Sequence, residues 1–223
     1  DMFGVQKFPM QEIESVDLVS SPKVIKTKVF EFLAKTVIIA TGAKPMKLSV
    51  KGENEFLGRG VSYCAVCDGA FYKDKIVAVV GGGNSAVEEA IYLTKFASKV
   101  YLIHRRDELR ADKIIQERAK KNEKIEFIWN SVVSEIQGAE LVNNLVLKDT
   151  NTNEQSNLAV DGIFPYIGIT PHVENISGQI AQDKSGFILT DETMKTSIDG
   201  VYAVGDVRKT PLRQVITAAS DGA

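Results

Sequence analysis

The sequence predicts an α/β fold, and three observations support this class. Residues 75–80 form a β-branched apolar run, which is typical of a buried strand. A glycine turn follows directly, and after it Val87, Ile91 and Leu93 recur at near-helical spacing. A second apolar run, residues 99–103, comes after this helix. Strand, helix and strand in this order predict a β-α-β unit.

The glycine turn has the spacing Gly-x-Gly-x-x-Ala between a strand and a helix, and in that context the pattern indicates dinucleotide binding. Gly81 allows the tight turn, Gly83 lets a pyrophosphate approach the backbone, and Ala86 lets the helix pack close to the strand. The pyrophosphate would lie on the free N–H groups at the positive end of the helix. The expected contacts therefore include Asn84 and Ser85.

The end of the second strand predicts which dinucleotide is bound. About 20 residues after the glycines, an NAD site usually carries a carboxylate that holds the ribose 2′-hydroxyl. Here His104, Arg105 and Arg106 occupy that place. A helix is expected over residues 107–121, and Arg110 would lie one helical turn beyond Arg106. Guanidinium groups suit a 2′-phosphate, so the sequence favours NADPH over NADH. The alternative is a solvated basic loop, which is weaker because cations at a helix start are unfavourable without an anion.

Composition excludes several classes of function. The chain has 223 residues, of which 44% are hydrophobic, which is enough for a sizeable core in one or two domains. The net charge of −2 implies no general affinity for nucleic acid. There is no run of about 18 apolar residues that would span a membrane, and no secretion signal. The expected compartment is the cytoplasm.

The chain has two cysteines, Cys64 and Cys67. A disulfide between residues three apart would constrain almost none of the chain. A structural zinc site would need two more ligands, and the histidines at 104 and 172 lack the spacing of a zinc finger, so no metal is expected. A redox-active pair is the interpretation that is left, with two buried free thiols as the alternative. A helix start over residues 64–71 would lower the thiol pKa.

The remaining elements are mostly strands. Strands are expected at 14–19, 23–32, 36–40, 125–129, 132–136, 141–148, 162–168, 187–189 and 200–204, a polar turn at 150–157, and a helix start at 212–219.

Three stretches carry a more specific pattern. They are Cys-Ala-Val-Cys-Asp-Gly at 64–69, Gly-Gly-Gly-Asn-Ser-Ala at 81–86 with His-Arg-Arg at 104–106, and Gly-Val-Tyr-Ala-Val-Gly-Asp at 200–206. Together they resemble the low-molecular-weight thioredoxin reductases, and their order and spacing match over almost the whole chain. The Cys-x-x-Cys-Asp placed just before the nucleotide-binding strand is the most specific of the three.

The resemblance implies two Rossmann-like dinucleotide-binding domains, with an NADPH domain inserted in an FAD domain. Residues 1–43 and 171–223 would belong to the FAD domain, and residues 44–170 would form the NADPH domain with the redox pair. The family opens with a strand, a Gly-x-Gly-x-x-Gly turn and a helix that hold the FAD pyrophosphate, and no such pattern precedes residue 30. The expected C-terminal helix is also cut short after residue 223, so the chain looks truncated at both ends. We expect it to bind NADPH without stoichiometric FAD, and not to turn over by itself.

In the reaction that the resemblance implies, NADPH gives a hydride to FAD, and the electrons pass through the Cys64–Cys67 disulfide to a disulfide of thioredoxin or a thioredoxin-like protein. Asp68 would donate or accept the proton, and its alternative role is that of a helix-start carboxylate. The intact protein would be a homodimer. The residues expected near FAD are Thr41, Gly42, Ala43, Gly205, Asp206, Arg213, Gln214 and Val215, which could otherwise be ordinary turn or surface residues.

Two other functions stay open. The flavoprotein subunit of a peroxide-reducing system uses a similar Cys-x-x-Cys, and a non-catalytic NADPH-binding fragment is the alternative from a different class. Ferredoxin and flavodoxin reductases of similar fold lack the cysteine pair, which counts against them.

Overall fold

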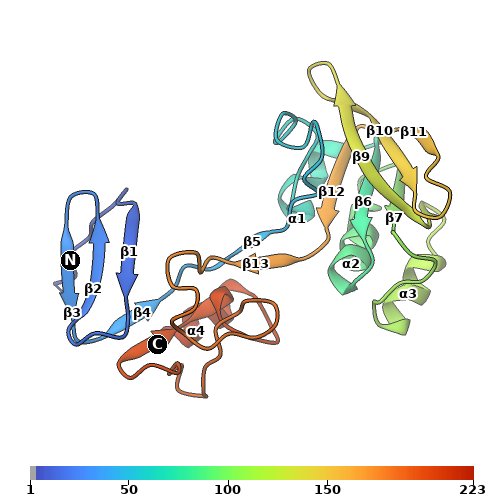
Figure 1. Cartoon of the computed structure of the whole chain (residues 1–223). Helices are drawn as coiled ribbons and strands as arrows, with labels where there is room; N and C mark the ends of the chain where they lie inside the picture. Colours follow the sequence, from blue (N-terminus) through green and yellow to red (C-terminus); the bar gives the residue numbers. More distant parts are fainter. Residues whose placement is uncertain (1–3) are drawn as a thin grey trace. The chain divides into compact units, whose positions relative to one another are not determined.

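The computed structural model describes residues 4–223 and divides the chain into two compact units (Figure 1). Unit 1 contains residues 4–44 and Ile169–Ala223, and unit 2 contains Pro45–Gly168. The chain passes between the units along β5 (Ala43–Pro45) and β13 (Ile169–Pro171), which pair with each other. The domain boundaries expected near residues 43 and 170 stay a prediction, and so does the nucleotide that each domain would hold.

Unit 2 is built on a parallel sheet with the strand order β12-β6-β7-β8. The strands are β6 (Ile76–Gly81), β7 (Lys99–Ile103), β8 (Ile125–Ile128) and β12 (Gly162–Tyr166). The helices α2 (Asn84–Leu93) and α3 (Lys113–Lys120) pack with one face of this sheet. The other face packs with an antiparallel sheet of β9 (Ser131–Gly138), β10 (Val142–Asp149) and β11 (Gln155–Ala159).

The central strand β6 shows why the apolar run at 75–80 is continuous rather than alternating. Val77 and Val79 pack with the helices, whereas Ala78 and Val80 pack with β9 and β10. A parallel strand covered on both faces needs apolar residues at every position. The short helix α1 (Ala65–Asp68) and a 3-10 turn, η1 (Gly69–Tyr72), precede β6.

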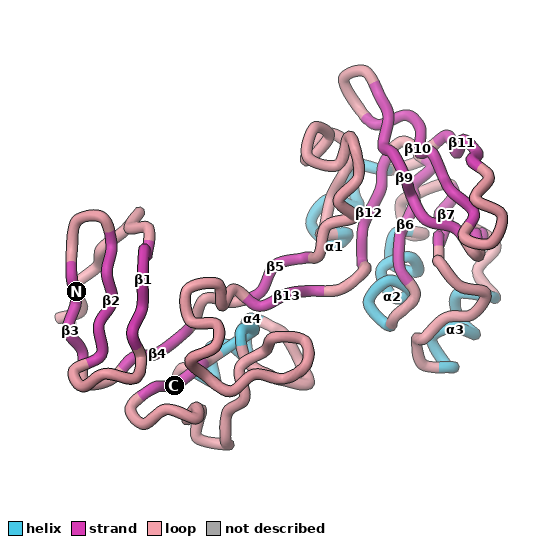
Figure 2. Tube along the Cα trace, in the orientation of Figure 1, coloured by secondary structure: helices cyan, strands magenta, loops and turns pink. Residues whose placement is uncertain are grey.

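Unit 1 contains less regular structure. An antiparallel sheet of β1 (Ile13–Asp17), β2 (Lys23–Thr27) and β3 (Glu31–Ala34) is followed by β4 (Val37–Ile39), which pairs in parallel with β14 (Val201–Ala203). The 3-10 turn η2 (Gly205–Val207) and the helix α4 (Val215–Asp221) follow β14. Most of the chain between β13 and β14 is loop (Figure 2).

Four expectations about these elements were wrong. The single strand expected over 23–32 is two antiparallel strands, because Thr27 closes a turn by accepting the N–H of Phe30 on its Oγ1 at 2.9 Å. Residues 155–157 belong to β11 rather than to a polar turn. Residues 187–189 form no strand, and Ile188 makes only isolated bridges.

The fourth correction concerns the helix expected over 107–121, which begins at Lys113. The N–H groups of Arg110 and Ala111 bond to the carbonyl of Gly82, at 2.7 and 3.1 Å. These contacts hold the segment after β7 against the glycine turn as a loop. Arg105 and Arg106 lie in this loop and therefore do not stand at a helix start, where a cation would be unfavourable. No helix within residues 4–223 combines the length and the apolar character that a membrane span requires.

Candidate functional site

The glycine turn lies between β6 and α2, as the sequence predicts, and two of its glycines are required by packing. Gly81 has φ of +152°, and a Cβ there would lie 2.4 Å from the carbonyl oxygen of Tyr166. A Cβ on Gly82 would lie 2.3 Å from the ring of His104. Gly83 differs, because a Cβ there would meet no atom within 4 Å and its φ is −93°. The space over Gly83 is therefore open to a ligand.

The first turn of α2 offers backbone donors beside this space. Gly83 is the N-cap residue, and no side chain caps the helix. Within the described part of the chain, the N–H groups of Asn84, Ser85 and Ala86 have no acceptor, and the first intrahelical bond runs from Val87 to Gly83. The side chain of Asn84 is used elsewhere, since it exchanges hydrogen bonds with Asp112 at 2.7 and 2.8 Å. Free donors at a helix start attract an anion.

A cavity of about 410 Å³ lies at the carboxyl end of the parallel sheet. Its wall combines the glycine turn, three cationic or ionisable side chains and an apolar part. The wall includes Gly81, Gly82, His104, Arg105, Arg110, Tyr166 and the apolar Leu48, Val80 and Ile103. Arg106 lies exposed in the same loop and does not line the cavity. The cavity therefore has guanidinium groups at one part of its wall and apolar side chains at another.

His104 is a buried ionisable residue among the expected nucleotide contacts, at 5% exposure. Burial, helped by the nearby charges of Arg110, Arg105 and Arg106, lowers the pKa of this imidazole below its ordinary value. The ring is therefore neutral at neutral pH. Its Nε2 is buried and has no hydrogen-bond partner among the described residues, which leaves it available to a bound molecule.

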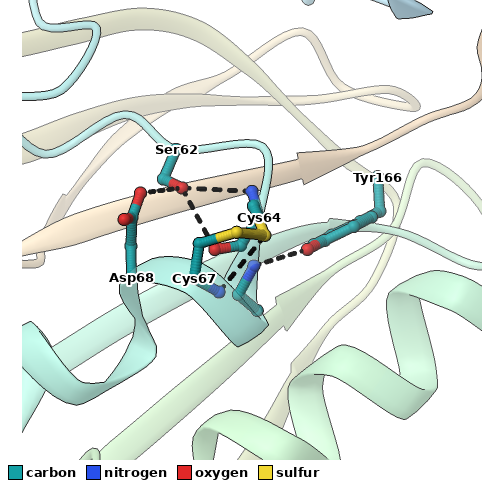
Figure 3. The surroundings of a disulfide bond; sticks show 6 residues. Ser62, Cys64, Cys67, Asp68 and Tyr166 are labelled. Atoms are coloured by element: carbon teal, nitrogen blue, oxygen red, sulfur yellow. Dashed lines mark hydrogen bonds between the residues drawn. A yellow bond between two sulfur atoms is a disulfide. The ribbon is translucent and has the colours of Figure 1, made fainter. Parts of the chain in front are cut away.

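The two cysteines form a disulfide across the first turn of α1, with their Cα atoms 5.3 Å apart (Figure 3). Cys64 is the N-cap residue, and its Sγ accepts the N–H of Cys67 at 3.2 Å. Cys67 is exposed, whereas Cys64 is half-buried. The disulfide is therefore reachable by a partner from the side of Cys67. The helix start expected over 64–71 is present, but it is a single turn of α-helix followed by η1.

Ser62 connects this disulfide to the expected acid. Its Oγ donates to Oδ2 of Asp68 at 2.6 Å and accepts the N–H of Cys64 at 3.1 Å (Figure 3). The N–H of Ser62 in turn bonds to the carbonyl of Ile163 on β12, at 3.1 Å. Ser62 therefore holds the Asp68 carboxylate and the Cys64 backbone in a fixed relation to the sheet. Sequence reasoning missed this serine.

Tyr166 is a second residue that sequence reasoning missed. Its hydroxyl accepts the N–H of Ala65 at 2.8 Å, and its side chain lines the cavity. The sequence feature that could have indicated this role is the aromatic residue at the end of β12. In a parallel sheet that position lies beside the end of β6, where the glycine turn begins.

The residues expected near FAD lie in unit 1, and they do not all line one cavity. Thr41 lines an apolar cavity of about 400 Å³ and donates its hydroxyl to the carbonyl of His172 at 2.6 Å. Residues 205–215 do not line this cavity. Arg213 lies over the ring of Phe187 at 4.3 Å, and its Nε is buried without a partner among the described residues.

The other expected FAD residues lie at turns and at a helix start. Gly42 and Gly205 have φ near +70°, Ala43 begins β5, Asp206 is half-buried in η2, and Gln214 and the exposed Val215 begin α4.

An α/β unit that combines a glycine turn, a basic cavity and a Cys-x-x-Cys disulfide is typical of a redox protein that uses a dinucleotide cofactor. Residues 4–222 match the pattern described as pyridine nucleotide-disulphide oxidoreductase, and the chain belongs to this family.

Curated relatives share about half of their residues with the chain. A thioredoxin reductase of Peptoclostridium acidaminophilum is 50% identical over 227 residues, which cover 99% of this chain and 72% of that protein. The thioredoxin reductase of Bacillus subtilis is 51% identical over 201 residues, or 90% of this chain and 64% of its own length. The crystal structure of Lactococcus lactis thioredoxin reductase is 48% identical and superposes with a TM-score of 0.80, covering 95% of this chain and 70% of that one.

Proposed function

We propose that the chain carries the NADPH-binding unit and the redox-active disulfide of a thioredoxin-disulfide reductase. In this enzyme electrons pass from NADPH through FAD and the Cys64–Cys67 pair to a protein disulfide. The observation that carries the proposal is the presence of a Cys-x-x-Cys disulfide and a glycine-turn cavity in one unit. The relatives named thioredoxin reductase, about 50% identical, support the same activity.

Unit 2 fits NADPH. The open space over Gly83 and the free N–H groups of Asn84, Ser85 and Ala86 would take the pyrophosphate. Arg105 and Arg110 line the cavity and would take the 2′-phosphate, and the buried Nε2 of His104 still has a hydrogen bond to offer. Arg106 is exposed in the same loop and would act as a further cation near the phosphate.

Unit 1 fits FAD only in part. The unpaired Nε of Arg213 and the turn residues Gly42 and Gly205 suit contacts with part of the cofactor. However, residues 4–44 and 169–223 contain no strand, glycine turn and helix in succession like β6, the glycine turn and α2. The α-helix described in these ranges is α4, which has seven residues, so these ranges offer no comparable pyrophosphate site. We therefore assign Thr41, Ala43, Asp206, Gln214 and Val215 to FAD contacts outside the pyrophosphate. The expectation that this chain alone holds no stoichiometric FAD stays a prediction.

The bound cofactors would supply the hydride chemistry, which reduces the Cys64–Cys67 disulfide to a dithiol. One of these thiolates attacks the disulfide of thioredoxin, which forms a mixed disulfide and releases one thioredoxin thiolate. The second cysteine attacks the mixed disulfide, which restores the Cys64–Cys67 bond and releases thioredoxin as a dithiol. Asp68, whose Oδ2 accepts the hydroxyl of Ser62 at 2.6 Å, would exchange the proton with a thiol.

The surroundings of the disulfide suit a protein substrate. Val66 and Phe71 flank Cys67 and are 63% and 75% exposed, so apolar surface is available next to the reactive bond. The intact enzyme would be a cytoplasmic homodimer.

The thiol chemistry can be tested without flavin. The chain is reduced with dithiothreitol, freed of the reductant, and mixed with oxidised thioredoxin in a single turnover. We expect one thioredoxin dithiol for each chain, and we expect one of the variants Cys64→Ser and Cys67→Ser to trap a mixed disulfide while the other reacts poorly. Ser98→Ala, an exposed substitution on the same unit, is the control. Failure of the reduced wild type to transfer electrons to thioredoxin would contradict the proposal.

A further inference from the structure

Tyr166 contacts both the cavity and the helix turn that carries the disulfide. It ends β12, where the parallel register places it beside Gly81, and its side chain lines the cavity with Gly82 and His104. Its backbone carbonyl leaves no room for a side chain at Gly81. The ring therefore belongs to the wall against which a dinucleotide would lie.

The hydroxyl of the same residue reaches the other site. It accepts the N–H of Ala65, the first residue of α1, at 2.8 Å (Figure 3). Ala65 is fully buried and stands between the two cysteines, so water cannot replace this acceptor. Burial raises the pKa of the phenol to about 12, so the hydroxyl stays neutral at neutral pH. One rigid side chain thus touches both the cavity and the turn that carries the disulfide.

We propose that Tyr166 is a positioning residue that links the two sites, so that dinucleotide binding and the redox state of Cys64–Cys67 change each other's equilibrium. This inference rests on the proposed function, since it requires the cavity to take NADP(H). Opening the disulfide frees Cys64 and Cys67 and relaxes the first turn of α1, to which the Tyr166 hydroxyl is bonded. A dinucleotide packed on the ring favours one position of that ring. The coupling must be the same in both directions.

The experiment measures NADP⁺ binding to the wild-type chain in two states, as the disulfide and after reduction by dithiothreitol, which becomes oxidised as the Cys64–Cys67 bond becomes a dithiol. NADP⁺ is the probe because it cannot reduce the chain. We expect the two dissociation constants to differ by about fivefold, the lower end of common coupling strengths. NADP⁺ must then shift the equilibrium between the chain and dithiothreitol by the same factor.

Tyr166→Phe separates the hydroxyl from the ring. Because the ring stays in the wall, NADP⁺ should bind the oxidised variant within about twofold of the wild type, whereas the ratio between the two redox states should fall toward one. Tyr101→Phe is the matched control, since Tyr101 lies half-buried on β7 and does not line the cavity. It should keep the wild-type ratio.

Ala65→Pro tests the same bond from the other side, and it decides the matter if Tyr166→Phe does not fold. Proline removes the N–H donor and is favoured at the first position of a helix. In this variant the ratio of the two NADP⁺ dissociation constants should also fall toward one. The double variant Ala65→Pro/Tyr166→Phe should show no further change in this ratio. Equal NADP⁺ affinity in both wild-type states, or a full ratio in Tyr166→Phe, would overturn the inference alone. No NADP⁺ binding in either state would overturn the proposed function as well.

Discussion

Units 1 and 2 differ in how much of their structure is fixed by a buried sheet. In unit 2, both faces of the parallel sheet are covered, and each face has its own cluster of buried side chains. Among the described residues of unit 1, the parallel pairing of named strands is that of β4 with β14, and one smaller cluster packs around Leu18 and Ile188. Ile38 on β4 is 65% exposed, whereas the residues of β6 are almost all buried.

The difference shows what a nucleotide site needs from its scaffold. In unit 2, the glycine turn is bonded on one side to the loop at Arg110 and packed on the other side against Tyr166. The donors of α2 are therefore held in place before any ligand arrives. In unit 1, the expected FAD residues lie on short elements and loops, and the buried Nε of Arg213 has no partner among them. Pre-organised binding is therefore expected from unit 2.

Two glycine substitutions in unit 2 test whether the turn binds the pyrophosphate as well as supporting the fold. Gly83→Ala places its Cβ in open space at an ordinary φ, so the thermal midpoint should not change. NADP⁺ affinity should fall by about tenfold or more, because the methyl group lies where the pyrophosphate approaches. The measurements are calorimetric titration and thermal unfolding.

Gly82→Ala is the matched variant, because its Cβ would collide with the buried ring of His104. It should lower both the thermal midpoint and NADP⁺ affinity. If Gly83→Ala binds NADP⁺ as the wild type does, the pyrophosphate does not lie over Gly83. Unit 2 would then lack the pre-organised pyrophosphate site that distinguishes it from unit 1.

Arg105 and Arg110 should determine the preference for the 2′-phosphate. Each lines the cavity, and loss of one charge-assisted hydrogen bond costs about 1.5–3 kcal/mol, or roughly 10- to 150-fold in affinity. Arg105→Ala should weaken NADPH by this factor and leave NADH almost unchanged, as measured by competition titration. Arg118→Ala, on the exposed side of α3, is the control. Equal binding of NADPH and NADH by the wild type would refute the assignment.

The same comparison explains how much the sequence could predict. The strands β6 and β7 and the helix α2 were predicted closely, because continuous burial and helical spacing leave a strong pattern in 75–103. The loop before α3 was predicted as helix, because its hydrogen bonds go to Gly82, a partner distant in sequence. The same reason hid Ser62 and Tyr166, whose roles depend on the register of β12 with β6. In unit 1, the short strands and loops are set by tertiary contacts that leave no periodic signal.

A half-buried ion pair in unit 1 gives the smallest expected effect and tests what holds that unit together. Nε and Nη2 of Arg208 each donate to the carboxylate of Asp221 at 2.6 Å, and the same carboxylate accepts the N–H of Gly205 at 3.0 Å. These bonds tie α4 to η2. The hydrogen bond from Arg208 holds the pKa of Asp221 below its ordinary value of 3.8. A lowered pKa means that the folded state favours the charged carboxylate, so this stabilisation is fully present above pH 3.8 and is lost as the pH falls through the lower, folded-state value.

Asp221→Asn should therefore lower the free energy of local unfolding around α4 by about 1–3 kcal/mol at pH 7, and the difference from the wild type should shrink under acid conditions. Hydrogen exchange measures this locally, with the amide of Gly205 reporting on unit 1 and the amides of β6 on unit 2. Only the former should exchange faster. Glu174→Gln breaks the exposed Lys44–Glu174 pair of the same unit and should change exchange very little, since exposed ion pairs contribute about 0–1 kcal/mol. If β6 exchanged faster by the same factor as Gly205, the two units would unfold as one, and the contrast between them would not extend to their stability.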